Sequence, residues 1–158
     1  MQTNMDIIDF VVPTGNFGNV YAGFYAKKMG LPIGKLVVAS NKNDILTRFF
    51  ESGKMEVLKS QESLSPSMDI QVSSNFERLL YYYTKDSNKV KNFYLELDKR
   101  GFFAVQPKVL REMLEVFSSG KLSDINTMKT IEKIYKKFKI IIDPHTAVGY
   151  SVGKKLLK

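Results

Sequence analysis

A segment rich in glycine and asparagine is the part of this sequence whose residue types are best suited to binding an anion. The segment Thr14-Gly15-Asn16-Phe17-Gly18-Asn19 follows a short run of β-branched and aromatic residues and precedes apolar residues at helical spacing. Glycine lets a backbone approach a ligand closely, and the N–H groups at a helix N-terminus carry partial positive charge. The side chains of Asn16 and Asn19 can add hydrogen bonds to an oxyanion. The segment therefore predicts a phosphate site.

The spacing of the glycines separates this loop from two common nucleotide-binding motifs. The loop has two glycines, three residues apart, and no lysine follows them as it does in GxxxxGK[ST]. It also lacks the GxGxxG pattern of dinucleotide-binding folds, so ATP and NAD are poorly supported as ligands. An ordinary tight turn between a strand and a helix is the alternative interpretation.

Several polar side chains outside the loop are further candidates for chemistry. His145, the one histidine of the chain, could act as a base, but its place beside Pro144 in a turn favours a structural role. Arg78 could clamp a phosphate with its planar guanidinium, or form a surface ion pair near a helix start. A polar loop could line a substrate pocket with Ser65, Ser67 and Asp69.

The elements around the loop are predicted from periodicity and from glycine stops. They are a buried strand at 7–12, a helix at 20–29, a second strand at 35–40, and a helix that follows a cap at 41–44 and runs through Phe50. The connection between the two strands is long enough for a right-handed crossover, so the strands are expected to be parallel.

The rest of the chain is predicted to be mainly helical. Periodicity fails between Met55 and Val72, which indicates an ordered loop, and Ser74 with Glu77 matches a capping box. The elements expected after this loop are helices at 75–84, 87–99, 107–118 and 124–138, a strand at 140–142, and a last helix at 146–157. With a helical excursion over about 75–139, the chain predicts an α/β domain whose mainly parallel sheet is flanked by helices.

Six segments of the sequence resemble blocks of the threonine synthases, in the same order along the chain. Such collinear agreement is not expected by chance. It spans nearly the whole chain, and 85–139 is the least distinctive part. The six segments are VPTGNFGN (12–19), GLPI (30–33), ASNKNDIL (39–46), LSPSMDI (64–70), SSNFERLL (73–80) and DPHTAVG (143–149).

This resemblance implies a cofactor, pyridoxal 5'-phosphate (PLP), and a fold-type-II PLP enzyme similar to the tryptophan synthase β subunit. It implies that the cofactor phosphate is held, mainly by backbone N–H groups, at Gly15, Asn16, Phe17 and Asn19. It also implies that the Thr146 hydroxyl faces the pyridine nitrogen, where a neutral partner leaves the ring a weaker electron sink than an acidic one. An N-cap to the last helix is the alternative role for Thr146.

The implied reaction converts O-phospho-L-homoserine and water to L-threonine and phosphate. The Schiff-base lysine of the family precedes the glycine loop, yet residues 1–12 contain no lysine, and Lys85 follows the loop at the end of a helix. We therefore expect no catalytic residue in this chain, which would be a single partial domain over 1–158 and inactive alone. Self-association or a complementing lysine-bearing polypeptide is the expected partnership, and a non-catalytic remnant is the alternative.

Composition excludes several other classes of protein. The chain has no cysteine and one histidine, which argues against a structural zinc site, and its apolar runs fall far short of the roughly 20 residues of a membrane span. Its start lacks the pattern of a signal peptide, so a cytoplasmic location is expected. The net charge of +8 raises the possibility of a basic nucleic-acid-binding module. A solvated helix face is favoured instead, because apolar residues at helical spacing interleave with Lys129, Lys133, Lys136, Lys137 and Lys139.

Overall fold

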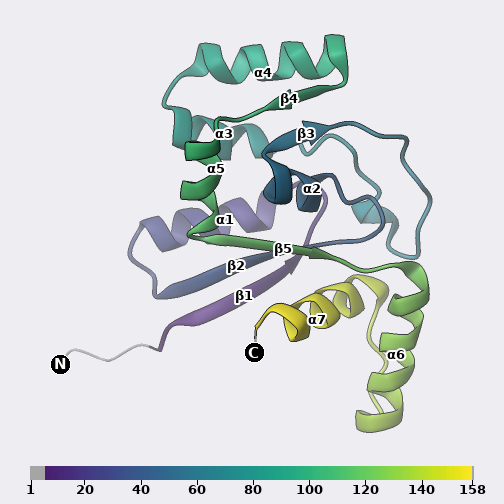
Figure 1. Ribbon diagram of the computed structural model, residues 1–158. Coiled ribbons are helices and arrows are strands. Elements are labelled where there is room, and N and C mark those ends of the chain that lie inside the picture. The colour runs from purple at the N-terminus through teal and green to yellow at the C-terminus, as the bar shows by residue number, and fades with distance from the viewer. Residues whose placement is uncertain (1–5, 158) are drawn as a thin grey trace, which may run out of the picture.

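A three-stranded parallel sheet lies at the centre of the computed structural model, which describes residues 6–157 (Figure 1). The strand order is β1-β2-β5, and both pairings are parallel. The strands are β1 (Ile8–Pro13), β2 (Ile33–Ser40) and β5 (Phe117–Lys121). The start of the chain, where no signal peptide is expected, lies outside the described residues as far as residue 5.

Helices and one small antiparallel pair of strands surround this sheet. The pair joins β3 (Lys54–Glu56) to β4 (Phe102–Ala104). The α-helices are α1 (Gly18–Lys28), α2 (Ile45–Ser52), α3 (Phe76–Thr84), α4 (Ser87–Arg100), α5 (Pro107–Leu114), α6 (Asp124–Phe138) and α7 (Pro144–Leu156), and η1 (Pro66–Met68) is a single 3₁₀ turn. None of the helices in the described part of the chain is both long and apolar enough to cross a membrane.

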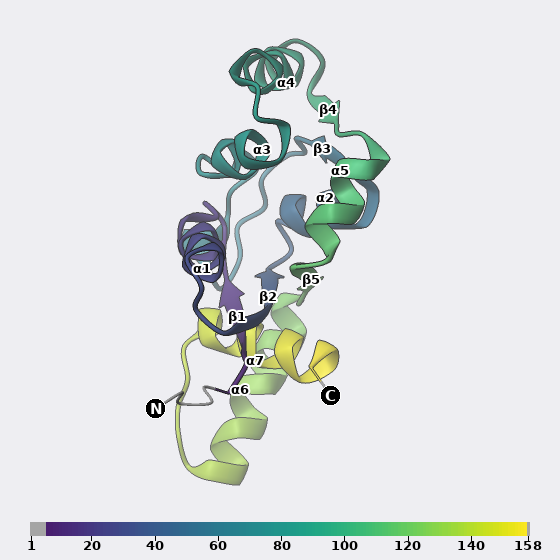
Figure 2. The ribbon, with the colours of Figure 1, turned by 90° about the vertical axis from the view of Figure 1, so that its left-hand side faces the viewer.

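The two faces of β2 pack against different layers. Leu36 and Val38 belong to the large hydrophobic cluster beneath α1, α2 and α3, whereas Val37 and Ala39 pack with residues of α7. Neighbouring side chains of a strand point to opposite faces of the sheet, so β2 is buried on both sides. In Figure 1, α6 and α7 accordingly lie below the sheet, and α1 to α5 lie above it or behind it. Figure 2 shows the same division from the side, with α4 farthest from the sheet.

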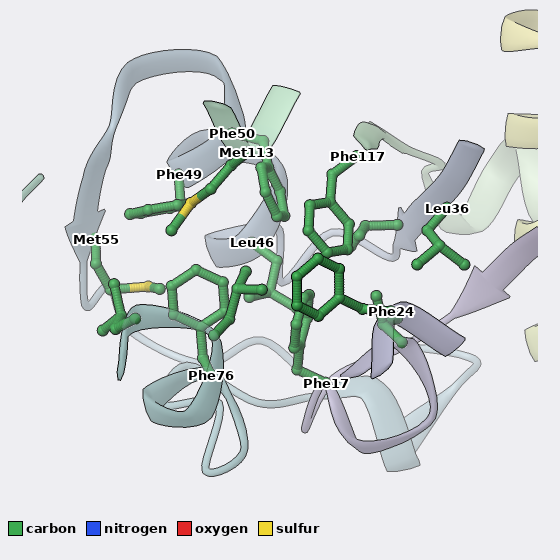
Figure 3. Close-up of a cluster of buried hydrophobic side chains, with 14 of the residues drawn as sticks. Phe17, Phe24, Leu36, Leu46, Phe49, Phe50, Met55, Phe76, Met113 and Phe117 are labelled. Carbon is green, nitrogen blue, oxygen red and sulfur yellow. The ribbon is translucent and has the colours of Figure 1, made fainter. Parts of the chain in front are cut away.

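Aromatic rings from distant parts of the chain fill the larger cluster (Figure 3). The Phe17 ring packs edge to face with Phe76 of α3 at a centroid distance of 5.1 Å, and it lies 5.8 Å from Phe117 of β5. Phe117 in turn stacks on Phe50 of α2 at 5.4 Å. The turn after β1 is therefore fixed to the core through a ring that is fully buried.

The structure confirms the expected α/β class, the parallel pairing of the first two strands and the helices that follow them. The prediction that the first strand is buried is wrong. Its residues Ile8, Asp9 and Phe10 are exposed, because β1 lies at an edge of the sheet and pairs only with β2 among the described residues.

The third strand of the sheet was predicted in the wrong place. Residues 140–142 form no strand, and Ile140 and Ile141 are exposed in the connection between α6 and α7. The third strand is β5, inside a span that was expected to be helical, and the helix predicted at 107–118 ends at Leu114. A short apolar run does not reveal its pairing partner, and β5 is defined by pairing with a strand far away in sequence.

Neither the helix cap predicted at Ser74 nor the alternative cap role of Thr146 is found. The N-cap of α3 is Asn75, not Ser74, and its side chain makes no capping hydrogen bond. The N-cap of α7 is Asp143, whose carboxylate accepts from the backbone N–H groups of His145 and Thr146. Pro144 at the first helical position explains this start, because its fixed φ suits the position and its missing N–H costs nothing there.

Candidate functional site

The loop between β1 and α1 has a backbone shape that the core enforces. Phe17 is a non-glycine residue in the left-handed region, with φ 63° and ψ 5°, and its ring is fully buried. Its N–H donates to Thr14 Oγ1 at 3.2 Å, and the N–H of Thr14 donates to the carbonyl of Ala39 at 3.0 Å. The loop is therefore rigidly tied to β2 and to the aromatic core, as a preorganised site requires.

Several backbone donors of this loop are left free. Within residues 6–157, Tyr21 is the first residue of α1 whose N–H has a hydrogen-bond partner, the carbonyl of Phe17 at 2.9 Å. The N–H groups at Gly15, Asn16, Gly18 and Asn19 have none among the described residues. Unpaired N–H groups at a helix start form a natural anion site. The N–H of Phe17, which was predicted to bind phosphate, is already paired with Thr14, whereas Gly18 was not predicted and does present a donor.

The start of α3 holds the loop from the other side. Asn75 donates to the carbonyl of Asn16 twice, from its backbone N–H at 3.1 Å and from its side-chain Nδ2 at 2.9 Å. Beside it, Ser73 Oγ is a buried hydroxyl that has no partner in the described part of the chain. For this segment the sequence indicated a helix cap, a surface ion pair or a phosphate clamp at Arg78, but no contact with the loop. In the structure the start of α3 fixes the backbone of Asn16, and the side chain of Asn16 is exposed.

The segment around η1 packs directly on Gly15. A Cβ atom at Gly15 would lie 2.9 Å from Ile70 Cδ1, 3.2 Å from Met68 Cα and 3.3 Å from the Ser67 carbonyl oxygen. A side chain at this position would therefore push η1 away from the loop. Glycine is needed here for close approach of two backbones, which is how a tight anion cradle is built.

A polar network fastens the loop that carries η1 to the end of β2. Asp69 Oδ1 accepts from Asn41 Nδ2 at 2.7 Å, from Asn43 Nδ2 at 2.8 Å and from Ser63 Oγ at 2.6 Å. Burial acts to raise the pKa of Asp69, but these hydrogen bonds outweigh it and the pKa is lowered. Ser65 is buried in the same network, while Ser67 is exposed. Asp69 and Ser65 thus hold the loop in place.

Thr146 lies in the first turn of α7, and α7 crosses the end of β1. A Cβ atom at Gly149 would lie 3.0 Å from Pro13 Cγ, so the helix touches the residue that leads into the loop. Thr146 Oγ1 donates to Asp143 Oδ2 at 2.5 Å. This bond, with those from His145 and from the Thr146 backbone, lowers the pKa of Asp143 to about 2. Asp143 was not predicted to matter, although its place before Pro144 is a recognisable helix-start signal.

Arg78 lies in the first turn of α3. Its side chain is exposed and lines a hollow of about 290 Å³ with Tyr21 and Tyr81. Among the described residues it forms neither the surface ion pair that was considered nor a hydrogen bond to a loop residue. Its predicted role in binding a substrate phosphate stays a prediction.

No protein-family model matches the chain. A threonine synthase of Schizosaccharomyces pombe is 41% identical and aligns with 99% of this chain, and one of Saccharomyces cerevisiae is 44% identical over 95% of it. The crystal structure of a PLP-bound threonine synthase from Brucella melitensis superimposes with a TM-score of 0.94 over 99% of the chain, at 41% identity. The chain is homologous to one portion of the threonine synthases.

This chain corresponds to only part of the length of a threonine synthase. The chain spans 35% and 32% of the two yeast relatives and 34% of the Brucella protein. Its fold is that of part of a fold-type-II PLP enzyme, in agreement with the expected class. The free N–H groups, the backbone contact at Gly15 and the orphaned Ser73 hydroxyl fit a bound phosphate group.

Proposed function

We propose that this chain supplies the cofactor-phosphate site of a threonine synthase, which converts O-phospho-L-homoserine and water to L-threonine and phosphate. The close superposition on a PLP-bound threonine synthase supports this proposal most strongly, because it extends over almost every described residue. The free donors of the loop after β1 support it independently, since they are suited to a phosphate group. A cytoplasmic location stays a prediction.

The residues of this chain would bind and orient the cofactor. PLP, when bound, supplies an electron sink for carbanion chemistry. The N–H groups of Gly15, Asn16, Gly18 and Asn19 would bind its phosphate, and the buried Phe17 ring would keep their geometry fixed. The Thr146 hydroxyl would face the pyridine nitrogen. The Thr146 hydroxyl already donates its proton to Asp143. Unless the hydroxyl rotates, its oxygen would therefore present a lone pair to the pyridine nitrogen.

The lysine that performs proton transfer in this family is not among the residues that match its blocks. We expect these 158 residues alone to form no threonine from O-phosphohomoserine with added PLP, because loss of a nucleophile and base that act as one unit costs many orders of magnitude in rate. Threonine and released phosphate are the quantities to measure. Turnover by the wild-type chain that Asn16→Ala and Thr146→Ala both abolish would show that a lysine within the chain does the work.

Borohydride reduction separates this claim from a failure to bind the cofactor. Fluorescence of added PLP should report binding that Asn16→Ala weakens, while reduction should trap no stoichiometric adduct at one lysine. A single fully labelled lysine would contradict the absence of the Schiff-base residue. A polypeptide carrying the lysine-bearing part of a threonine synthase should restore turnover when it is co-expressed with this chain.

The structure gives no support to a nucleic-acid-binding function. The lysines of α6 are exposed around a helix whose buried residues are Thr127 and Ile134, which is the arrangement of a solvated face. A non-catalytic remnant would share the fold and the loop. It would differ in gaining no activity from the lysine-bearing polypeptide.

A further inference from the structure

Three side chains at the start of α7 and on η1 form a hydrogen-bonded row, of which the proposed function uses only Asp143, as the partner of Thr146. Ser67 Oγ lies 2.5 Å from His145 Nε2, and His145 Nδ1 lies 3.1 Å from Asp143 Oδ1. Ser67 and Asp143 are exposed and His145 is partly buried, so the row is open to solvent. A hydroxyl, an imidazole and a carboxylate in this order are the parts of an activated nucleophile.

Packing beneath the row fixes its two halves against each other. Met68, which follows Ser67, is 2% exposed and packs in one hydrophobic cluster with Val148 and Val152 of α7. The 3₁₀ turn is itself closed by the Met68 N–H, which donates to the Ser65 carbonyl at 2.9 Å. Ser67 and His145 are 78 residues apart in sequence, and their meeting depends on this cluster.

Asp143 fixes the orientation of the imidazole. Its Oδ1 accepts from the backbone N–H groups of His145 and Thr146 at 2.9 and 3.1 Å, and its Oδ2 accepts from Thr146 Oγ1. A carboxylate beside Nδ1 favours the tautomer of neutral imidazole whose proton is on Nδ1. Nε2 then holds a lone pair, and Ser67 Oγ–H is the donor to it.

We propose that Ser67, His145 and Asp143 form a nucleophilic site that reacts with acyl and phosphoryl electrophiles at Ser67 Oγ. This site goes beyond the proposed synthase function and needs no cofactor. In the reaction, Ser67 Oγ bonds to the electrophilic phosphorus or carbonyl carbon while its proton passes to His145 Nε2. The leaving group departs with the bonding electron pair, and the Asp143 carboxylate balances the imidazolium.

The backbone N–H of Ser67 could also donate a hydrogen bond to the oxygen of the electrophile, on which negative charge develops during the reaction. Among residues 6–157 the N–H of Ser67 has no hydrogen-bond partner. In chymotrypsin-like serine proteases the N–H of the nucleophilic serine itself is one donor of the oxyanion hole. The structure thus places nucleophile, base, orienting carboxylate and one oxyanion donor within two short segments.

Labelling with diisopropyl fluorophosphate tests this proposal on the chain as it is. The reagent loses fluoride when it phosphorylates a serine, and peptide mass spectrometry identifies the residue. We expect Ser67 to be labelled, and His145→Gln to slow the labelling about 100-fold or more, the usual effect of losing a general base. Asp143→Asn retains a side-chain oxygen that can cap the helix, although it loses the carboxylate charge, and should slow labelling because the imidazole loses its orienting charge.

Ser87 is the matched control, because it is an exposed helical serine with no imidazole partner among the described residues. Ser87→Ala should leave the labelling rate of Ser67 unchanged. In urea, where the fold is lost, the labelling rate at Ser67 should fall to the rate at Ser87. This measurement on the wild-type chain tests the hydrogen-bonded row even if a variant folds poorly. Equal rates at the two serines in the native chain, or an unchanged rate in a folded His145→Gln variant, would overturn the proposal.

Discussion

Phe17 connects the backbone of the loop to the packing of the core. Its left-handed conformation is one that a bulky residue adopts only under constraint, and its ring contacts Phe76 and Phe117 in the aromatic cluster. The sequence identified the loop through Gly15 and Asn16. It could not reveal that Phe17 acts as a core residue with a paired N–H, because both facts depend on segments distant in the chain.

The acid sensitivity of the fold should have a component at Asp143. Its pKa is held at about 2, against an ordinary value of about 3.9, so its contribution to stability is present above about pH 4 and is lost as the pH falls towards 2. Asparagine resembles the protonated carboxyl. We therefore expect Asp143→Asn to lower the melting temperature at neutral pH, and the difference from wild type to shrink between about pH 4 and 2. A difference that is the same at both ends of this range would contradict the assignment.

At the scale of elements, the close contact between the loop and η1 decides the geometry of the site. Gly15→Ala should destabilise the fold by about 1–3 kcal/mol, the usual cost of overpacking, because the added methyl meets Met68 Cα and Ile70. Gly18→Ala is the control in the same turn, where a Cβ would lie 3.4 Å from Asn75 Nδ2 in ordinary contact. Urea unfolding of both variants measures the difference. Equal stability of the two would show that η1 does not press on Gly15.

The elements that were predicted correctly are those with strong local signals. The βαβ unit from β1 to β2 follows from β-branched runs and a glycine stop at Gly30, where φ is 102°. The position of β5 does not follow in this way, because Phe117 and Gly120 belong to the sheet only through pairing with β2. The partner of Thr146, Asp143, was missed for a different reason, since its signal is local: threonine and aspartate are both good N-caps, and the start at Pro144 decides between them.

At the scale of the whole molecule, much apolar surface remains uncovered. It lies on the edge strand β1, around α6 and in the connection to α7, at Ile8, Phe10, Ile125, Met128, Tyr135, Phe138, Ile140 and Ile141. Exposed patches of more than a few hundred Å² usually mark partner surfaces. We expect self-association or binding of a hydrophobic dye, measured by sedimentation and fluorescence. A monomer that melts sharply and binds no dye would instead indicate a self-contained unit.

The sheet order also has a kinetic consequence. Thr47 Oγ1 donates to the carbonyl of Gly120 across 73 residues, and β5 reaches β2 only after that long stretch has been brought back. Closing a long loop costs entropy before its contacts repay it, so folds with distant pairings form slowly. The backbone amides of β1 and β2 should therefore gain protection from hydrogen exchange earlier during refolding than those of β5. In that interval the edge of β2 that pairs with β5 is still unoccupied, and another copy of the chain can take the place of β5 before its own strand arrives.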